Sequence, residues 1–225
     1  MGAGRHAAHP GGGSAGAPAE SWILQLLAAP RTASEAEGQP RVLVLGPVEV
    51  VDAPVAEAEW GAYVRAAVQD EATVSSDWQE FQALYARGIA ERGAAGDTAL
   101  ARALALVRGA PFAEVTGPDY AWAEPFRTAI AQQIVDAAHE LTLRRLRMGD
   151  HRGAEAAAAR GLVVAPQAQL LLRDLLCVHA DERATAALQR TAARLERLAA
   201  QDGARLEAES TALLSELRGG EPAWS

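Results

Sequence analysis

Histidine, cysteine and carboxylate side chains are the groups in this chain that could carry out acid–base, nucleophilic or metal chemistry. The one cysteine, Cys177, lies in the apolar run LLLRDLLCVH without an activating neighbour, which favours a buried, inert thiol over a nucleophile. His139 borders the apolar face of a predicted helix, where a partly buried, hydrogen-bonded imidazole is favoured over a metal ligand. No two histidines have the i, i+4 spacing that places two zinc ligands on one helix face. The histidines are His6, His9, His139, His151 and His179.

The carboxylates are numerous, but they are dispersed along predicted helix faces, where solvation is their ordinary role. The sequence contains neither a phosphate-binding loop nor a dinucleotide-binding fingerprint. Residues 12–16 match the glycine-flanked pattern of a nucleophile elbow, but no predicted strand precedes them and no helix follows. We therefore predict a binding or scaffolding protein that is not an enzyme and uses no metal ion and no cofactor.

Composition favours helices and a reducing compartment. Hydrophobic residues make up 49% of the 225 residues, and much of this is alanine, which together with arginine and glutamate favours helices. The net charge of −8 does not attract nucleic acid or anionic lipid. A single cysteine cannot form an internal disulfide, as in most cytoplasmic proteins. The apolar run at residues 22–29 is too short for a membrane span, so we expect a soluble cytoplasmic protein without a membrane partner.

The longest predicted helix covers residues 119–148. Asp119, which follows Pro118, is a suitable N-cap, and Gly149 stands where a helix end favours a positive φ. Apolar residues recur at steps of three and four, which predicts one buried face along the helix. They are Trp122, Phe126, Ile130, Ile134, Ala137 and Leu141.

Capping patterns place the other helices. Ser76 and Gln79 form a capping box that opens a helix ending near Gly93, and Asp97 is predicted to cap the next helix, which ends at Gly109. Later helices are expected to open at Asp150, at Pro166 in a first turn, and at Asp181, and a last one covers residues 206–217. The first of these helices should direct inward Trp78, Phe81, Leu84, Tyr85 and Ile89.

Paired helices of this length with short connections predict an all-α, tetratricopeptide-like antiparallel helical array. We expect Trp122 and Phe126 to pack against residues of the preceding helices. The predicted core comprises Trp78, Phe81, Leu104, Trp122, Phe126, Ile130, Ile134 and Leu141.

The regions outside the array are less regular. Residues 1–40 are rich in Gly, Ala, Pro and Ser and are predicted to be a disordered tail, and 219–225 form a second tail. Two short strands, 42–45 and 48–51, flank Gly46-Pro47 and predict a β-hairpin. An isolated hairpin is only marginally stable in water, so it must pack on another element.

Several segments, in their order along the chain, resemble the bacterial transcriptional activator domain. This is the helical, tetratricopeptide-like C-terminal module of actinobacterial pathway regulators, and it also ends large proteins with a LysM segment. The resemblance covers residues 74–218 and implies a helical module at 75–218. The segments are Asp77-Trp78 with Phe81, LALVRGAPFAEV from Leu104, YAWAEPFRTAIAQQIVDAAHELTLRRLRMGDHRGAEAAAARGL from Tyr120, LLLRDLLCVHA from Leu170, and ARLEAESTALLSEL from Ala204.

The family places a winged helix–turn–helix before this module, opening with a V-L-G-P-V-x-V strand pair similar to residues 44–50. Only 25 residues separate Val51 from Asp77, too few for a winged-helix core with its recognition helix. Residues 41–96 carry four Arg against nine Asp and Glu, the wrong sign for phosphate contacts. We therefore interpret residues 41–74 as a hairpin and the remnant of a winged-helix region.

Two function classes follow from these observations. The first is a regulator-family protein that acts through a helical protein-interaction module, without DNA binding of its own, on another regulator or the transcription machinery. The second is a helical-repeat adaptor unrelated to transcription, or a truncated, non-functional remnant of a larger regulator. Self-association is also compatible with an alanine-rich array. A solvated helix end or a contact for an acidic partner is predicted at Arg144, Arg145 and Arg147.

Overall fold

The computed structural model confirms the predicted all-α helical array with a small N-terminal β-hairpin. Its contacts divide the chain into two compact units, residues 1–130 and 131–225, each of which is described by itself below. The structure describes residues 41–52, 75–113, 121, 123–201 and 205–219.

The first unit contains a three-stranded sheet. Strands β1 (Arg41–Leu43) and β2 (Glu49–Val51) pair antiparallel, with Val42 opposite Val50, which confirms the hairpin. Strand β3 (Ser75–Ser76) pairs parallel with β1, giving the order β2-β1-β3. Strand β3 was not predicted, because its two serines show no apolar alternation.

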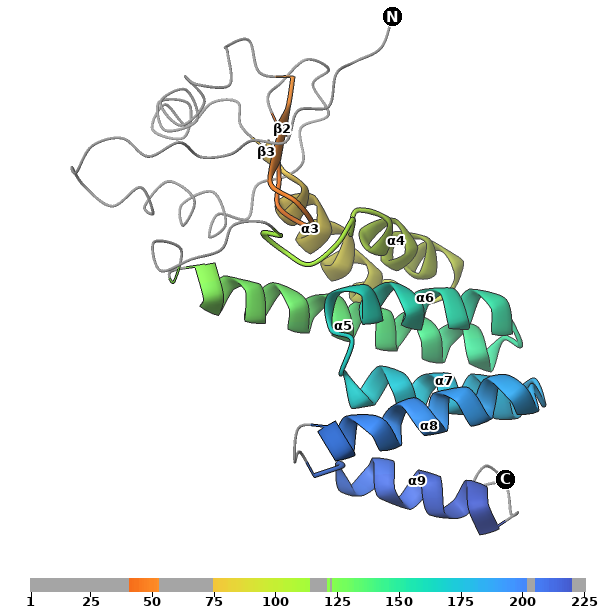
Figure 1. Cartoon of the computed structure of the whole chain (residues 1–225). Helices are drawn as coiled ribbons and strands as arrows, with labels where there is room; N and C mark the ends of the chain where they lie inside the picture. Colours follow the sequence, from red (N-terminus) through yellow and green to blue (C-terminus); the bar gives the residue numbers. More distant parts are fainter. Residues whose placement is uncertain (1–40, 53–74, 114–120, 122, 202–204, 220–225) are drawn as a thin grey trace, which may run out of the picture. The chain divides into compact units, whose positions relative to one another are not determined.

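Ser76 ends the sheet and also begins the first described helix, α3 (Asp77–Ala90). Its side chain accepts a hydrogen bond from the Gln79 amide, and the Gln79 side chain accepts one from the Ser76 amide, which confirms the predicted capping box. The helix ends at Ala90, three residues before Gly93. Figure 1 shows the strands beside α3.

The face that α3 buries differs from the prediction at Ile89, which is 45% exposed. Gly88 is buried instead, and a Cβ there would lie 2.6 Å from Leu100 Cγ in helix α4 (Ala94–Ala105). Because the two helices approach each other at a glycine, the neighbouring isoleucine is turned toward solvent.

Helix α4 begins earlier than expected. Gly93, with φ of 77°, is its N-cap, and no side chain caps it. Asp97 lies within the first turn, where a carboxylate is favourable because of the helix dipole. The prediction of Asp97 as the cap was therefore wrong.

The core of the first unit combines aromatic and aliphatic side chains from the sheet, α3 and α4. The Trp78 and Phe81 rings stack with centroids 5.4 Å apart, and Phe81 is fully buried. Phe126, expected in this core, is only partly buried in helix α5 (Glu124–Arg147). Trp122 and Asp119 lie outside the described residues. Buried members are Val42, Val44, Leu45, Trp78, Phe81, Leu100, Leu104, Val107, Phe112 and Ile130.

The second unit contains α5 from residue 131 onward and the helices α6 (His151–Val164), α7 (Gln169–Asp181), α8 (Thr185–Gln201) and α9 (Ala208–Gly219). Figure 1 shows α6 to α9 as successive layers, and α7 contacts α6, α8 and α9. The Asp150 side chain accepts a hydrogen bond from the Gly153 amide as the predicted cap of α6, and Gly149 has φ of 73°.

Two helix starts in this unit were predicted wrongly. Helix α7 begins at Gln169, after Pro166 rather than on it, and Asp181 is the last residue of α7 rather than the cap of α8. The turn between α7 and α8 contains Arg183 at φ of 58°. A left-handed arginine is rare because its Cβ crowds the backbone, so no sequence signal marks this turn.

Small residues let α5, α6 and α7 pack closely. A Cβ on Gly161 of α6 would lie 2.5 Å from Leu171 Cδ1 and 2.8 Å from Ala138 Cβ. The buried side chains of α5 in this unit are Ile134, Val135, Ala137, Ala138, Leu141 and Thr142.

Candidate protein-interaction surface

The helix pair α5/α6 is followed by a second pair, α7/α8, whose boundaries lie at a fixed sequence offset from those of the first. Helices α5 and α7 end at Arg147 and Asp181, and α6 and α8 begin at His151 and Thr185. Each offset is 34 residues, the length of a tetratricopeptide unit. The residues with positive φ in the two turns, Gly149 and Arg183, have the same offset.

A histidine–aspartate pair joins the first helices of the two pairs. His139 Nδ1 on α5 lies 2.7 Å from Asp174 Oδ2 on α7. The Asp174 side chain is almost fully buried, and that of His139 is 30% exposed. The hydrogen bond that His139 donates to Asp174 raises the pKa of His139, whereas burial raises the pKa of Asp174. Both groups therefore hold protons more tightly than in the unfolded chain.

An equivalent link joins α7 to α9. Arg173, 34 residues after His139, donates to the carboxylate of Glu207, which directly precedes α9, and to Ser210 Oγ at 2.8 Å. The Gln169 side chain accepts a hydrogen bond of 2.9 Å from the Glu207 amide. The basic side chains at corresponding positions of α5 and α7, His139 and Arg173, thus each bind a carboxylate on, or directly before, the first helix of the next pair. We find no sequence signal for these pairs apart from the 34-residue offset itself.

The Cys177 thiol, close to the His139–Asp174 pair, is unsuited to nucleophilic chemistry. Cys177 lies one turn after Asp174, and burial together with the Asp174 charge raises the pKa of the thiol to about 11. A thiol with this pKa is protonated at neutral pH and is a poor nucleophile. No group of three potential metal ligands occurs in the part of the chain that the structure describes.

The other two described histidines, His151 and His179, are held by a hydrogen bond or by burial within the chain. His151 of α6 hydrogen-bonds through Nε2 to Asp181 at the end of α7. His179 is buried, its Nδ1 has no hydrogen-bond partner among the described residues, and burial lowers its pKa. His6 and His9 lie outside the described residues.

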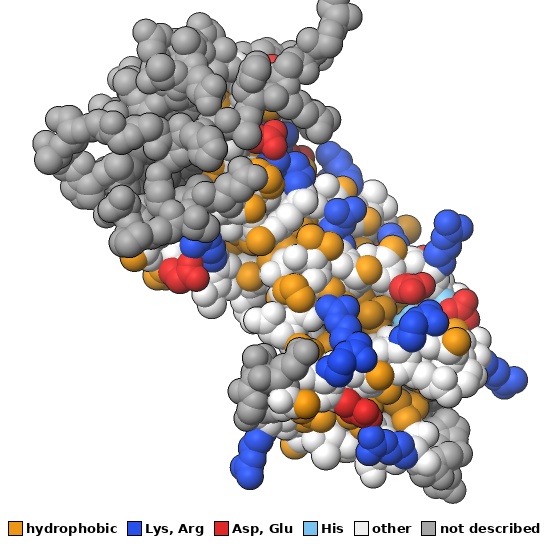
Figure 2. All heavy atoms as spheres, viewed as in Figure 1, with side chains coloured by type: hydrophobic (Ala, Val, Ile, Leu, Met, Phe, Trp, Pro, Cys, Tyr) orange, Lys and Arg blue, Asp and Glu red, His pale blue; other side chains and the backbone are white. Residues whose placement is uncertain are grey.

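The three arginines that end α5 do not form one free patch. Arg144 Nε donates to Glu140 at 2.6 Å, and Arg145 donates to the Gly153 carbonyl at 3.1 Å, which ties the end of α5 to α6. Arg147 is exposed, and the next residue, Met148, is 72% exposed. The candidate partner contact is therefore reduced to Arg147 and Met148. On the face shown in Figure 2, arginine side chains stand apart, with acidic side chains among them.

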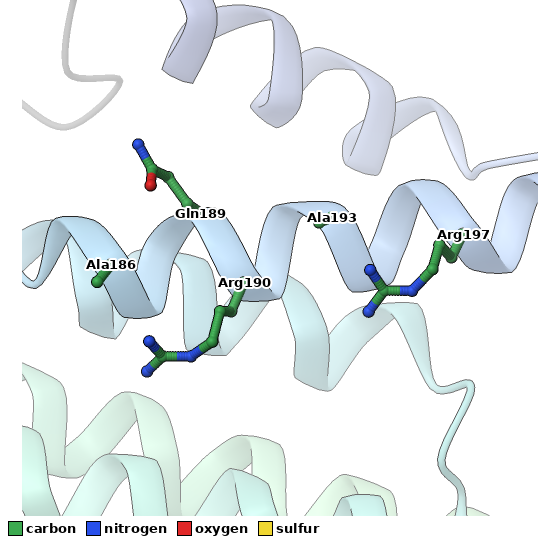
Figure 3. A pocket seen from close by; sticks show the side chains of 5 residues that line it. All are labelled: Ala186, Gln189, Arg190, Ala193 and Arg197. Atoms are coloured by element: carbon green, nitrogen blue, oxygen red, sulfur yellow. The ribbon is translucent and has the colours of Figure 1, made fainter.

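Helix α8 carries a shallow, open hollow of about 490 Å³ on its outward face. Figure 3 shows the side chains of Arg190 and Arg197 extending from the same side of α8, whereas Gln189 extends from the other side. The lining residues are Ala186, Gln189, Arg190, Ala193 and Arg197.

In the first unit, the hairpin is tied to the helices by a buried carboxylate. Asp77 accepts hydrogen bonds from the amides of Val44 and Leu45, at 2.8 and 3.1 Å. Arg108 Nη2 lies 3.8 Å from the same carboxylate, but burial outweighs these contacts and raises the Asp77 pKa. Arg108 also donates to Glu49 and to the Pro47 carbonyl.

Backbone hydrogen bonds complete this junction. The amides of Arg108 and Gly109 donate to the Leu45 carbonyl, and the Phe112 amide donates to the Val44 carbonyl. Two motifs of the family resemblance, at residues 44–50 and 104–112, therefore pair with each other. The sequence predicts that the hairpin packs on another element, but no pattern in it identifies the segment after α4 as that element.

Among the residues that the structure describes, no helix is long and apolar enough to cross a bilayer. No protein-family model, curated protein or solved structure matches this chain.

Proposed function

We propose that this chain is a transcription-regulator protein that acts by binding other proteins through its helical repeats, without contacting DNA itself. The observation that carries the proposal is the 34-residue recurrence of α5/α6 in α7/α8, with side-chain hydrogen bonds that link α5 to α7 and α7 to α9. Stacked units of this kind present extended surfaces for protein partners. The assignment to transcription rests on the resemblance to the bacterial transcriptional activator domain.

Three paired arginines of the first unit support the absence of DNA contact. Arg41 and Arg87 are paired with Glu80 and Glu91, and Arg108 is paired with Glu49. Phosphate binding requires cations that can replace counterions along the DNA backbone. Arginines that already neutralise carboxylates contribute little to such binding.

The test is partner capture from the chain's own host by cross-linking in living cells. We expect the tagged chain to retain another regulator or a polymerase subunit, and the variant Arg147→Glu/Met148→Ser to retain less of it. A matched control, Arg92→Glu/Ile89→Ser, changes an exposed arginine and an exposed apolar side chain of the first unit.

Each outcome decides between the two function classes. Capture of partners with no role in transcription supports the adaptor and contradicts the regulator. Absence of any specific partner contradicts both. Equal loss of the partner in the test and control variants argues against the contact at Arg147 and Met148, while leaving the capture itself as support for a protein-binding role.

A further inference from the structure

The outward face of α8 carries a row of alternating charge and small side chain. Arg190, Ala193 and Arg197 follow one another at steps of three and four residues and line the hollow of Figure 3. Both arginines are exposed. Seven residues of helix place their Cα atoms about 10 Å apart along the axis. We call Arg190, Ala193 and Arg197 the arginine row.

Helix α9 carries a row of the opposite charge with the same spacing. Glu209, Ala212 and Glu216 also follow at steps of three and four residues, and all three are exposed. The orientation of α9 is fixed by its buried face and by its contact with α7. We call these three residues the glutamate row. The buried residues of α9 are Ser210, Leu213 and Leu214.

The charged groups of both rows are available. The ion pairs that hold α9 within its own chain use other residues, Arg173 with Glu207 and Arg218 with Glu196. Among the described residues, no hydrogen bond or ion pair engages the four charged groups of the two rows. The alanine at the centre of each row leaves space for the backbone of a facing helix to approach.

We propose that two copies of this chain associate through these rows, with the arginine row of each copy against the glutamate row of the other. The two rows belong to consecutive helices of one compact unit, and a two-fold dimer would contain the contact between them twice. Matching spacing brings each guanidinium to a carboxylate when the two alanines meet. The whole chain has a net charge of −8, which opposes non-specific association and makes the local match decisive. This proposal goes beyond the proposed function and does not depend on it.

The test is sedimentation velocity of the full chain up to about 1 mM, because a few exposed ion pairs support only weak association. At low salt we expect the mass to rise from 23.6 kDa toward twice that value. High salt should return the protein to the monomer, since exposed charges are screened. Arg190→Glu/Arg197→Glu and Glu209→Arg/Glu216→Arg should each remain monomeric.

A mixture of the two charge-reversed variants is the strongest test. One variant then carries two acidic rows and the other two basic rows, so the mixture should form a heterodimer although neither variant associates alone. The control Arg92→Glu/Arg102→Glu changes the net charge as much as Arg190→Glu/Arg197→Glu does, but at exposed residues of the first unit. It should dimerise like the wild type. Circular dichroism of each variant verifies that it is folded.

Three outcomes would overturn the proposal. They are a monomeric wild type at every concentration, a dimer that survives both charge reversals, and a mixture that stays monomeric. Binding of a helical peptide with glutamates seven residues apart, by a wild type that stays monomeric, would instead assign the arginine row to a different protein.

Discussion

His139 and Asp174 are 35 residues apart in sequence, yet their side chains meet at 2.7 Å and connect two helix pairs. The hydrogen bond that His139 donates to Asp174 raises the pKa of His139, and the charges of Asp136 and Glu140 act in the same direction. The link therefore contributes most to stability when the imidazole is protonated.

This relationship predicts a pH dependence of stability. Because the folded pKa of His139 is raised above 6.5, its contribution is fully present below pH 6.5 and is lost as pH rises through the folded pKa. Burial likewise raises the pKa of Asp174 above 3.8, so its effect on stability also weakens the fold as pH rises, but in a lower pH range. Burial lowers the pKa of His179, so its effect on stability is the opposite and weakens the fold as pH falls. The pH dependence of the wild-type free energy of unfolding combines these effects. A variant of His139 is therefore needed to isolate the contribution of the pair.

His139→Gln keeps a donor for Asp174 but cannot be protonated. We expect the free energy of unfolding of the wild type to exceed that of the variant at pH 6, and the difference to shrink by about 1 kcal/mol at pH 9. Urea unfolding followed by circular dichroism at both values measures it. A difference independent of pH would show that the pair is not charged in the fold.

The second prediction concerns the approach of α5, α6 and α7 at Gly161. A Cβ at this position would lie 2.5 Å from Leu171 Cδ1, so Gly161→Val should destabilise the second unit by about 1–3 kcal/mol. The control Ala159→Val places the same side chain on the exposed face of α6 and should cost less than about 0.7 kcal/mol. Equal effects of the two variants in thermal unfolding would contradict the close packing.

The third prediction concerns Asp77, which binds the hairpin to α3. Asp77→Ala leaves two buried amides without an acceptor, at roughly 1–3 kcal/mol each. Asp77→Asn keeps one acceptor oxygen and should lie between the alanine variant and the wild type. Four of the five tryptophans precede residue 131, so tryptophan fluorescence during urea unfolding reports mainly on this unit.

A control distinguishes the buried carboxylate from an ordinary acidic residue at a helix start. Glu209→Ala removes an exposed carboxylate from the first turn of α9 and should cost only about 0.3–1 kcal/mol. If Asp77→Ala and Glu209→Ala proved equally costly, the hydrogen bonds to Val44 and Leu45 would not be the source of stability.

The helices could be predicted because their signals are local. Apolar spacing marks buried faces, and the side chains of Ser76 and Asp150 bond to amides only three residues away. The same local rules failed at Asp97 and Asp181, because an acidic residue also suits the first turn of a helix and tolerates its last position. The signal alone does not separate these roles.

The candidate site was harder to predict because its contacts are distant in sequence. His139 and Asp174 carry no motif, and neither does the contact of Asp77 with Val44. The cluster at Arg144, Arg145 and Arg147 could be located from sequence, but only the structure shows that Arg144 and Arg145 bind within the chain. Gly88 was missed for a related reason, since a buried glycine has no apolar side chain for a periodicity to detect.

The last prediction is that the chain alone does not bind duplex DNA specifically. Residues 41–96 carry four Arg against nine acidic residues, and the hairpin is fastened to the helices through Asp77 and the Arg108–Glu49 pair. In the described residues of the strand pair, 41–52, Arg41 is already paired with Glu80, which leaves it little capacity to bind phosphate. In a mobility-shift titration at low salt, where electrostatic binding is strongest, we expect no sequence-specific shift. Weak retention should vanish as salt is raised and should be competed equally by random DNA, whereas a shift that random DNA competes poorly would show that the chain reads DNA.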